Sequence, residues 1–524
     1  MSMDIDLKSL NESQLRDLSS RLLDELNRKQ SDEERYQSEI AKRDHTIAHL
    51  SLRNEQLTHE LAILKRHKFD RSSEQTGSTQ LRLLDEAVNE DVCAIELELE
   101  QNTRDLGQQP RTKQVAKRQA LPAHLPRKIV RHDPESTECS CGCQMVHMGD
   151  DISEKLDYEP GHFSVEQHVR SKWACRRCET VVQKPVDAHV IDKGIPTTNL
   201  LAQVLIAKYA DHQPLYRQQQ IYQRAGVDLP RTTLSEWVGR CGYEITPLVE
   251  ALRASLLTNP ILHADETPVN MLDRGNKKTK KAYVWAYATP SWCATQAVVY
   301  DFQPSRAGES SRLFLEGWQG HLVCDDYTGY KAGFGLGMTE VACWAHARRK
   351  FHELQVNHAS PIADKAMALI GTLYAIEREA ADLSPDERYA LRQTHAKPIL
   401  DQLHDWLIRE REGLPDSGRS ARAFDYALKR WLALKRYLDD GAIPIDNNWI
   451  ENQIRPWALG RKNWLFAGSL HSGQRAANVM TLIQSAKING LDPQRYLKDV
   501  LERLPTAKQS DLEGLLPHNW RSCV

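Results

Sequence analysis

Three short segments of the chain each place a carboxylate at the end of an apolar stretch. They read HADETP around Asp265, VCDDYTGY around Asp325 and IDNNWIENQIRP around Glu451. Two aspartates and one glutamate form an oxygen ligand set that suits a pair of hard cations aimed at a phosphodiester. Because the segments are far apart in the chain, the fold must bring them together, and this requirement constrains it more than any other feature.

The sequence around the first two carboxylates predicts a β-sheet. Three β-like runs follow from Pro260 (ILHADETPV, KKAYVWAYAT and TQAVVYDF), and a helical stretch, SSRLFLEGW, precedes a fourth run, HLVCDDYTGY. An Asp on the first and fourth strands in this order is typical of an RNase H-like core. One Asp after an apolar run also has an ordinary reading as a turn former, but three carboxylates in order favour a metal site. Since side chains alternate along a strand, we expect Glu266 and Asp326 to face away from Asp265 and Asp325.

A long helical region, running to about Asp440, separates Asp325 from Glu451. Apolar helical repeats such as ADKAMALIGTLYAIERE indicate a helical insertion rather than a linker. It opens with a basic run that could clamp DNA ends or form a solvated helix face: Arg348, Arg349 and Lys350.

The segment around Glu451 predicts a helix that begins near Trp449. Asn447 and Asn448 can cap it, which puts Glu451 in the first turn. Basic residues follow within reach of a phosphate: Arg455, Arg461 and Lys462. Three tryptophans are expected to pack on the core rather than to stack on bases: Trp449, Trp457 and Trp464.

Composition bounds the kind of protein that carries these segments. At 524 residues the chain is too long for one core, and about 150 residues per domain suggests three or four domains. The formal net charge is −2, so affinity for DNA must come from local patches. No apolar run reaches about 18 residues, which argues against a membrane span and favours a soluble, unexported protein.

Five of the eleven cysteines cluster, which favours a metal over disulfides and fits a reducing cytoplasm. CSCGC spans Cys139, Cys141 and Cys143, and CRRC spans Cys175 and Cys178, with a β-like run between them. Two cysteine pairs at this separation are typical of a zinc ribbon with four thiolate ligands. Which two of the first three cysteines bind stays open. We expect two nearby histidines to be surface residues rather than ligands: His147 and His168.

The N-terminal region carries a heptad pattern of about four repeats that indicates a coiled coil. Its two seam positions hold Tyr36, Arg43, Leu50, Leu57 and Leu64, and Ile40, Ile47, Asn54, Leu61 and Lys68. Asn54 paired with its own symmetry mate could fix register and a dimer. The alternative is an amphipathic helix that packs on its own domain.

Between the coiled coil and the cysteines the charge changes sign. An acidic helical stretch runs from Leu81 to Glu100, and a basic, proline-interrupted stretch runs from Arg104 to Arg131. We interpret the second as a flexible linker that either follows a phosphate backbone or is merely solvated.

Three helical patterns follow the cysteines: LLAQVLIAKYADH, QPLYRQQQIYQRAG and RTTLSEWVGRCG. Short helices around a turn with glycine form the outline of a helix-turn-helix, an outline that ordinary helical domains share. The candidate recognition helix opens with Arg231, Thr232 and Thr233. The end of the chain is expected to form two short helices split by Gly490 and Pro493.

Many ordered segments resemble the DDE transposases of the insertion-sequence-66 family over nearly the full chain. They include HKFDRSSE, the cysteine pairs, KYADHQPLYRQQQIYQRAGVDLPRTTLSEWV, ADETPV, CDDYTGYK, CWAHARRKF, IDNNWIENQIRPWALGRKNWLFAGS and GLDPQRYLKDVLERLP. The resemblance implies that Asp265, Asp325 and Glu451 are the catalytic triad, and that magnesium and a zinc-binding domain are needed. Many relatives have Gly in place of Asp326 and Arg in place of Asn452.

The expected fold is a multidomain α/β protein whose RNase H-like core carries a helical insertion. Its expected parts are an N-terminal helix and coiled coil (1–75), an acidic helix and basic linker (76–130), a zinc-ribbon-like module (131–190), a helix-turn-helix-like DNA-binding domain (191–258), the core in two parts (259–345 and 442–480), the insertion (346–441) and a C-terminal helical module (481–524).

The expected function is that of a DNA transposase that cleaves strands at terminal inverted repeats and transfers the 3′-OH ends into target DNA. Two Mg²⁺ ions, with Mn²⁺ as an alternative, and a structural Zn²⁺ are the expected cofactors. The chain should associate with itself, with accessory proteins of the same element and with the bacterial nucleoid, but with no membrane. The alternatives are a non-catalytic DNA-binding protein of a mobile element and a generic RNase H-like nuclease.

Overall fold

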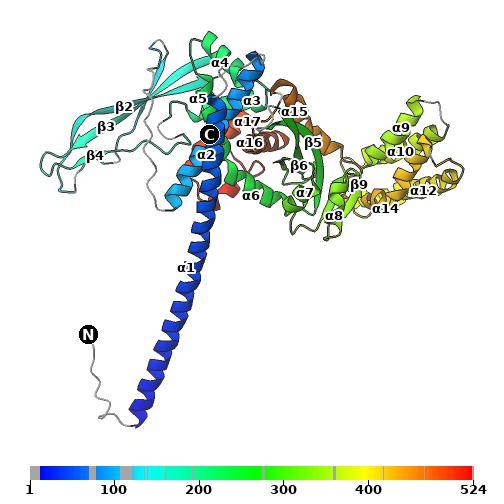
Figure 1. The fold of residues 1–524 in the computed structure, drawn as a ribbon, viewed down its shortest axis with the longest axis horizontal. Coiled ribbons are helices and arrows are strands. Elements are labelled where there is room, and N and C mark those ends of the chain that lie inside the picture. Colours follow the sequence, from blue (N-terminus) through cyan, green and yellow to red (C-terminus); the bar gives the residue numbers. More distant parts are fainter. Residues whose placement is uncertain are drawn as a thin grey trace. The chain divides into compact units, whose positions relative to one another are not determined.

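The computed structural model describes residues 12–69, 78–106, 121–123, 125–134, 136–138, 140–159, 161–191, 194–273, 278–357, 361–416, 418–464 and 466–521. Among these, one compact unit lies within 1–73 and 95–116, and the second within 74–94 and 117–524. Figure 1 labels the helices and strands along the chain. No helix in the described ranges is both long enough and apolar enough to cross a membrane.

The first unit pairs a long helix, α1 (Glu12–Phe69), with the second half of α2 (Ser78–Asp105). Leu57 and Ile95 are buried, and Arg53 donates to Glu98 at 2.7 Å. The amide oxygen of Asn54 accepts a hydrogen bond from Asn102 at 2.9 Å. Asn54 therefore has a partner within its own chain, which differs from the expected pairing with a symmetry mate.

Other positions of the predicted coiled-coil seam face solvent. Tyr36, Ile40 and Ile47 are 56, 58 and 50% exposed, whereas Leu57 is buried against its own chain. The helix itself is confirmed, and two seam residues, Asn54 and Leu57, are used inside the chain. Self-association through the exposed positions stays a prediction.

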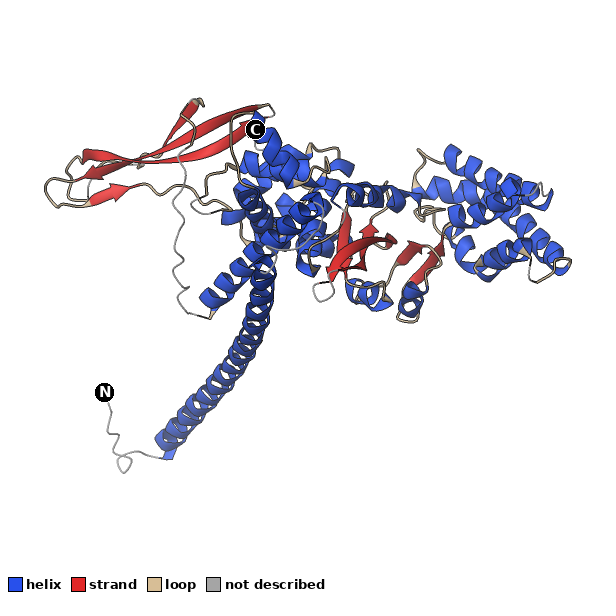
Figure 2. Cartoon of the chain, turned by 45° about the horizontal axis from the view of Figure 1, so that its top comes forward, coloured by secondary structure: helices blue, strands red, loops and turns tan. Residues whose placement is uncertain are grey.

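The cysteine-bearing module is a small sheet with the order β1-β3-β2, in which β4 also pairs with β3. Its strands are β1 (Arg127–Arg131), β2 (Val146–Glu159), β3 (His162–Ala174) and β4 (Val181–Gln183). Figure 2 shows these strands as a group separate from the second sheet. The β1 and β3 strands run parallel, and the other pairs run antiparallel.

Two expectations for this module were wrong. The basic linker was expected to continue to Arg131, but Arg127 opens a strand because its guanidinium is bound internally, to the Leu125 carbonyl at 2.8 Å and to Glu154 at 3.2 Å. Linker residues 107–120 lie outside the described residues. His168 is buried, not a surface residue, and its Nδ1 lies 2.9 Å from Nε2 of His132.

Four helices follow: α3 (Thr198–Tyr209), α4 (Leu215–Arg224), α5 (Arg231–Glu244) and α6 (Thr246–Leu256). The turn between α4 and α5 contains Gly226, whose φ of 84° favours glycine. Leu234, Trp237 and Val238 bury one face of α5. Thr232 is exposed on the other face of α5. The three predicted helices are present as α3, α4 and α5.

The second sheet has the order β7-β6-β5-β8-β9. Its strands are β5 (Ile261–Asp273), β6 (Lys278–Ala288), β7 (Val298–Gln303), β8 (His321–Cys324) and β9 (Thr339–Ala342), with α7 (Gly308–Phe314) and α8 (Thr328–Phe334) between them. The first three strands are antiparallel, and β8 and β9 run parallel to β5. The predicted order of three strands, a helix and a fourth strand is confirmed.

A helical insertion follows β9 directly, and its apolar core is continuous with Ile261, Val323, Val341 and Ala342 of the sheet. It contains α9 (Trp344–Asn357), α10 (Pro361–Glu379), α11 (Pro385–Leu391), η2 (Arg392–Ala396), α12 (Lys397–Glu412), α13 (Arg419–Lys429), α14 (Trp431–Lys435) and η3 (Arg436–Leu438). Its two ends meet, because the Trp344 N–H donates to the Ile445 carbonyl at 3.1 Å. The chain therefore returns to the sheet where it left it.

After the insertion come α15 (Asn448–Trp464), α16 (Leu470–Ile488), α17 (Pro493–Arg503), η4 (Leu504–Thr506) and η5 (Gln509–Leu515). Side chains of α16 satisfy the free edge of β7: Thr481 Oγ1 accepts from the Tyr300 N–H at 2.9 Å, and Ser485 Oγ donates to the Val298 carbonyl at 2.8 Å. This contact covers a strand edge that would otherwise have unpaired backbone groups. Trp457 is buried, as expected for core packing.

Candidate active site

Asp265 and Asp325 come from neighbouring parallel strands. The last pair in the register of β5 and β8 joins His263 to Val323, and each aspartate follows that pair by two residues. Asp265 Oδ1 accepts the Glu266 N–H at 2.8 Å, and Asp325 Oδ1 accepts the Tyr327 N–H at 2.9 Å. One oxygen of each carboxylate is thus oriented by the backbone.

The acids lie close enough to affect one another. Burial, and after it the nearby charges of Glu266, Asp325 and Glu451, raise the pKa of Asp265 to about 8. An acid in such surroundings is ionised at neutral pH only when a positive charge compensates it. The donor set therefore fits hard cations, which take carboxylate oxygens as ligands.

The spacing of the acids is wider than a single-ion cage. Among the described residues, ligand atoms within 4.8 Å of one another occur in threes only at a cysteine cluster, so the three carboxylates are more widely spread.

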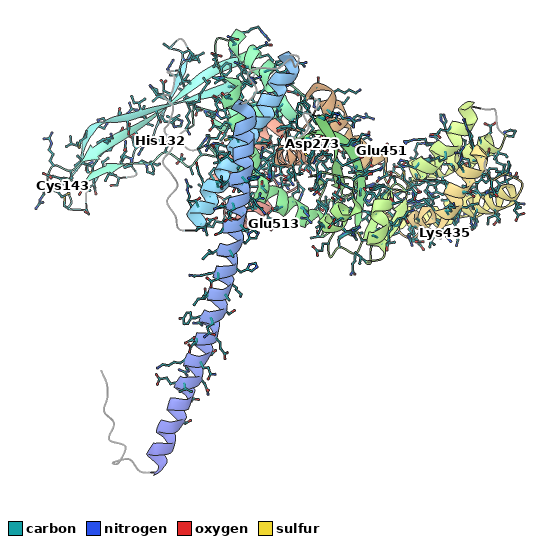
Figure 3. The ribbon with its side chains drawn as sticks, in the orientation of Figure 1. His132, Cys143, Asp273, Lys435, Glu451 and Glu513 are labelled. Carbon is teal, nitrogen blue, oxygen red and sulfur yellow. The ribbon has the colours of Figure 1, made fainter. Side chains whose placement is uncertain are left out.

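Glu451 lies in the first turn of α15, as predicted (Figure 3). The start of α15 is held by a residue that was not expected there. The carboxylate of Asp446 accepts hydrogen bonds from the Asn448 N–H at 3.0 Å and from the Asn448 side-chain amide at 2.8 Å. Asn447 was expected to cap the helix, but its side chain is used elsewhere.

Asn447 is fully buried and ties α15 to β5. Its Nδ2 donates to the Ala264 carbonyl at 2.8 Å, and its Oδ1 lies 2.8 Å from Nδ1 of His263. Since that oxygen can only accept, His263 donates from Nδ1. Burial lowers the pKa of His263 to about 4, so the ring is neutral at neutral pH. The helix that carries Glu451 is thereby attached to the residue preceding Asp265.

Two side chains of α9 approach Glu451. His346 Nε2 lies 3.8 Å from Glu451 Oε1, and Arg349 Nη2 lies 4.0 Å from Glu451 Oε2. Burial lowers the pKa of His346, although the charge of Glu451 opposes this effect. Sequence reasoning assigned Arg349 to DNA and gave His346 no role. In the sequence, the one feature that pointed to these two residues was the basic run at the start of the insertion.

The acids next to the two aspartates have basic partners. Glu266 is buried, and it pairs with Arg306 and accepts from the Tyr330 hydroxyl at 2.8 Å. Asp326 lies 3.3 Å from Lys331 and 3.6 Å from Arg430. These partners already compensate the charge of both acids.

The predicted DNA-binding residues differ in what they contact. Arg461 donates to the Pro268 carbonyl at 2.6 Å, so its charge is used to hold α15 on β5. Other members of the predicted set are exposed: Thr232, Arg348, Arg349, Lys350, Arg455 and Lys462. Arg231 and Thr233 are partly buried at the start of α5.

Cysteine sulfurs converge at the end of the β2–β3 module away from the turn between these strands (Figure 3). The Sγ atoms of Cys141, Cys143 and Cys175 lie within 4.8 Å of one another. Cys141 is 3.6 Å from Cys175 and 3.8 Å from Cys178. Zinc–sulfur bonds of about 2.3 Å in a tetrahedron require sulfurs about 3.8 Å apart, so this cluster fits the metal. Cys139 lies outside the described residues.

Backbone N–H groups favour the thiolate that such a site needs. The pKa of Cys175 is lowered, first by the N–H of Cys178 and then by that of Arg177. The thiolate is the form that binds zinc.

Comparison with known proteins decides the family. A family model described as "Transposase IS66 family" matches residues 193–475, which hold all three carboxylates. The chain belongs to this family. Three further models of the IS66 family or its neighbours match, a zinc-finger binding domain at 136–179, a C-terminal element at 481–518 and a "Transposase C of IS166 homeodomain" at 56–130.

Relatives of the IS66 chain occur in Sinorhizobium fredii. Protein y4jD is 37% identical over 417 residues, covering 77% of this chain and 82% of the relative. Protein y4qI is 35% identical over 491 residues, covering 89% and 90%. The likeness therefore extends through nearly all parts of the chain.

Proposed function

We propose that the chain is a DNA transposase that cleaves strands at the terminal inverted repeats of its element and joins the 3′-OH ends to target DNA. Asp265, Asp325 and Glu451 would hold two Mg²⁺ ions, or Mn²⁺ in their place. The observation that carries this proposal is the convergence of these three acids from β5, the end of β8 and α15 in a chain of the IS66 family.

The second sheet would be an RNase H-like core. Its order β7-β6-β5-β8-β9, with the first three strands antiparallel and the last two parallel to β5, supports this proposal. The helical insertion would then interrupt the core between β9 and α15 without separating its parts, because its ends meet at Trp344 and Ile445.

The chain's own residues hold and orient the reacting groups. Asp265 and Asp325 each use Oδ1 for a backbone N–H, which leaves Oδ2 for a cation. Two ions held there would supply activation of the attacking water or 3′-hydroxyl and stabilisation of the leaving oxygen in an in-line displacement. Arg349, beside Glu451, is positioned to neutralise a non-bridging phosphate oxygen.

The remaining parts would bring DNA to this site. The exposed basic residues of α9 and α15 would contact phosphates, and the start of α5, from Arg231 to Thr233, would read the element ends. A structural zinc held by Cys141, Cys143, Cys175 and Cys178 would stabilise the small sheet. Self-association through α1, accessory proteins and action at the bacterial nucleoid complete the proposal.

Strand cleavage by isosteric variants tests the proposal. Linear DNA with the flanking element ends is incubated with Mg²⁺ and the parent chain or Asp265→Asn, Asp325→Asn or Glu451→Gln, and with Asp382→Asn as a control on the exposed surface of the insertion. We expect the first three variants to bind ends but not cleave them, and the control to do both. Cleavage retained by all three would overturn the proposal. Binding without nicking by the parent would indicate a regulator, and cleavage without preference for ends would indicate a generic nuclease.

A further inference from the structure

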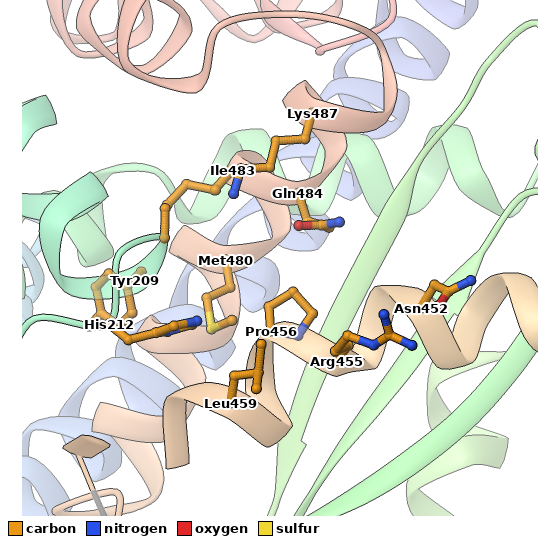
Figure 4. A pocket seen from close by; sticks show the side chains of 11 residues that line it. Tyr209, His212, Asn452, Arg455, Pro456, Leu459, Met480, Ile483, Gln484 and Lys487 are labelled. Atoms are coloured by element: carbon orange, nitrogen blue, oxygen red, sulfur yellow. The ribbon is translucent and has the colours of Figure 1, made fainter. Parts of the chain in front are cut away.

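A cavity of ≈ 240 Å³ lies beside α15, between this helix, α16 and the end of α3 (Figure 4). It is smaller than the roughly 300–1,000 Å³ typical of drug-sized ligands, so it suits one flat ring system rather than an extended molecule. None of the three carboxylates lines it. Asn452, which lines it, directly follows Glu451 in the chain.

Part of the cavity wall is apolar. Tyr209, Met480 and Ile483 are buried there, and Pro456 and Leu459 extend the wall along α15. Figure 4 shows Met480 and Pro456 directed toward the same space. Flat apolar faces of this kind suit a base that has left its stack.

The polar groups of the cavity match the edge of a base. Asn452 is exposed, and its side chain makes no hydrogen bond among the described residues. Pro456 has no N–H, so the Asn452 carbonyl lacks its normal helical donor four residues later. Gln484 uses its Nε2 on Gln453 at 2.8 Å, which leaves its oxygen available to a donor. The cavity thus offers both donors and acceptors.

Two cations border this space. Arg455 and Lys487 are exposed and line the cavity. Arg455 lies four residues after Glu451, so it stands on nearly the same face of α15, one turn further on. Its guanidinium can contact the phosphate of a nucleotide next to one held at Glu451.

We propose that this cavity takes one nucleotide, extruded from the DNA strand whose phosphodiester lies at Asp265, Asp325 and Glu451. The base would enter between α15 and α16, and Arg455 and Lys487 would bind its phosphates. This inference rests on the proposed function and adds a binding site to it. A duplex cannot enter a space of this size, so the base must leave the stack first.

Fluorescent base scanning tests the proposal. The fluorescent base 2-aminopurine is placed at each of the terminal positions of an element-end duplex in turn, and the duplex is bound by full-length Asp265→Asn protein, which cannot cleave it. We expect fluorescence to rise several-fold at one position of one strand. Adding Leu459→Trp, which fills the cavity from its exposed side, should abolish the rise while end binding is kept. The matched control is Leu432→Trp, at another exposed leucine, in the insertion, which should leave the rise intact.

Rescue separates a lost site from a misfolded chain. In otherwise parental protein, Leu459→Trp should slow cleavage roughly tenfold, as the loss of a base contact worth about 1–3 kcal/mol predicts. An abasic nucleotide at the responsive position should restore that rate, because it needs less room. The inference is overturned if no position responds, if Leu459→Trp leaves the response unchanged, or if the abasic substrate does not rescue. If the parent protein cleaves element ends but no 2-aminopurine position gives a fluorescence rise, the proposed function still holds and this inference fails. If the Asp265→Asn protein itself cleaves the ends, the proposed function fails.

Discussion

Asn447 and His263, 184 residues apart in the chain, share a buried hydrogen bond of 2.8 Å. The same amide donates to the Ala264 carbonyl, which precedes Asp265. Because Glu451 lies one turn after Asn447, these two bonds set the position of the glutamate relative to the first aspartate. The spacing of the acids thus depends on a residue that is not itself an acid.

Replacing Asn447 with Ala should impair cleavage more than end binding. The change leaves the His263 N–H and the Ala264 carbonyl buried without partners, which costs about 1–3 kcal/mol each. We expect a lower melting temperature and a cleavage rate that falls further than the loss of folded protein explains. The measurements are thermal unfolding and single-turnover cleavage. Asn463→Ala, on the same helix and with its side chain donating to the Leu459 carbonyl at 3.4 Å, is the control and should change neither.

Arg349 and Arg348 are adjacent and both exposed, yet only Arg349 lies near Glu451. We expect Arg349→Ala to slow single-turnover cleavage about ten- to hundredfold, because it removes a charge next to the reacting phosphate. Arg348→Ala should mainly weaken DNA binding and reduce its salt dependence. Equal effects of the two changes on the cleavage rate would contradict the assignment.

Zinc content should depend on four of the five clustered cysteines. Single changes to Ser at Cys141, Cys143, Cys175 and Cys178 should each lower the zinc bound to the full chain, whereas Cys139→Ser should not. Elemental analysis of purified protein measures this directly. Zinc lost in Cys139→Ser but kept in Cys143→Ser would assign the ligands differently.

A buried ion pair links α2 to α16. Asp91 is fully buried and accepts from Arg475 at 2.5 Å. Asp91→Ala leaves a buried guanidinium without its partner, and we expect a loss of about 3–5 kcal/mol in the free energy of unfolding. The double variant Asp91→Leu with Arg475→Met should recover most of this loss. Denaturant unfolding of the three proteins checks both results, and a double variant no better than the single one would contradict the argument.

The exposed seam of α1 should govern self-association. Ile40→Lys with Ile47→Lys introduces charges at two seam positions, and we expect the population to shift toward monomer in sedimentation velocity. Leu52 is 58% exposed on the same helix but off the seam, so Leu52→Lys is the control and should not change the oligomeric state. A parent chain that is already monomeric would exclude the coiled-coil dimer.

Local pattern was enough to predict most elements and the segments of the candidate site. β-like apolar runs predicted β5, which carries Asp265, and β8, which Asp325 directly follows, and capping residues predicted the helix of Glu451. These predictions succeed because each depends on residues close together in the chain. The same locality explains the errors at Arg127 and His168, because Arg127 pairs with Glu154 of β2 and His168 contacts His132, which follows β1.

The sequence by itself determined the identity and order of the three acids, the cysteine pairs and the alternation of strands and helices around them. Tertiary structure alone decided how the acids are held: Asn447 binds β5 instead of capping its helix, and His346 and Arg349 approach Glu451. It also decided that Asn54 pairs with Asn102 within the chain. Each of these contacts joins residues tens to hundreds of positions apart. Such contacts form only when distant parts of the chain meet, as the two ends of the insertion do at Trp344 and Ile445. No local periodicity predicts them.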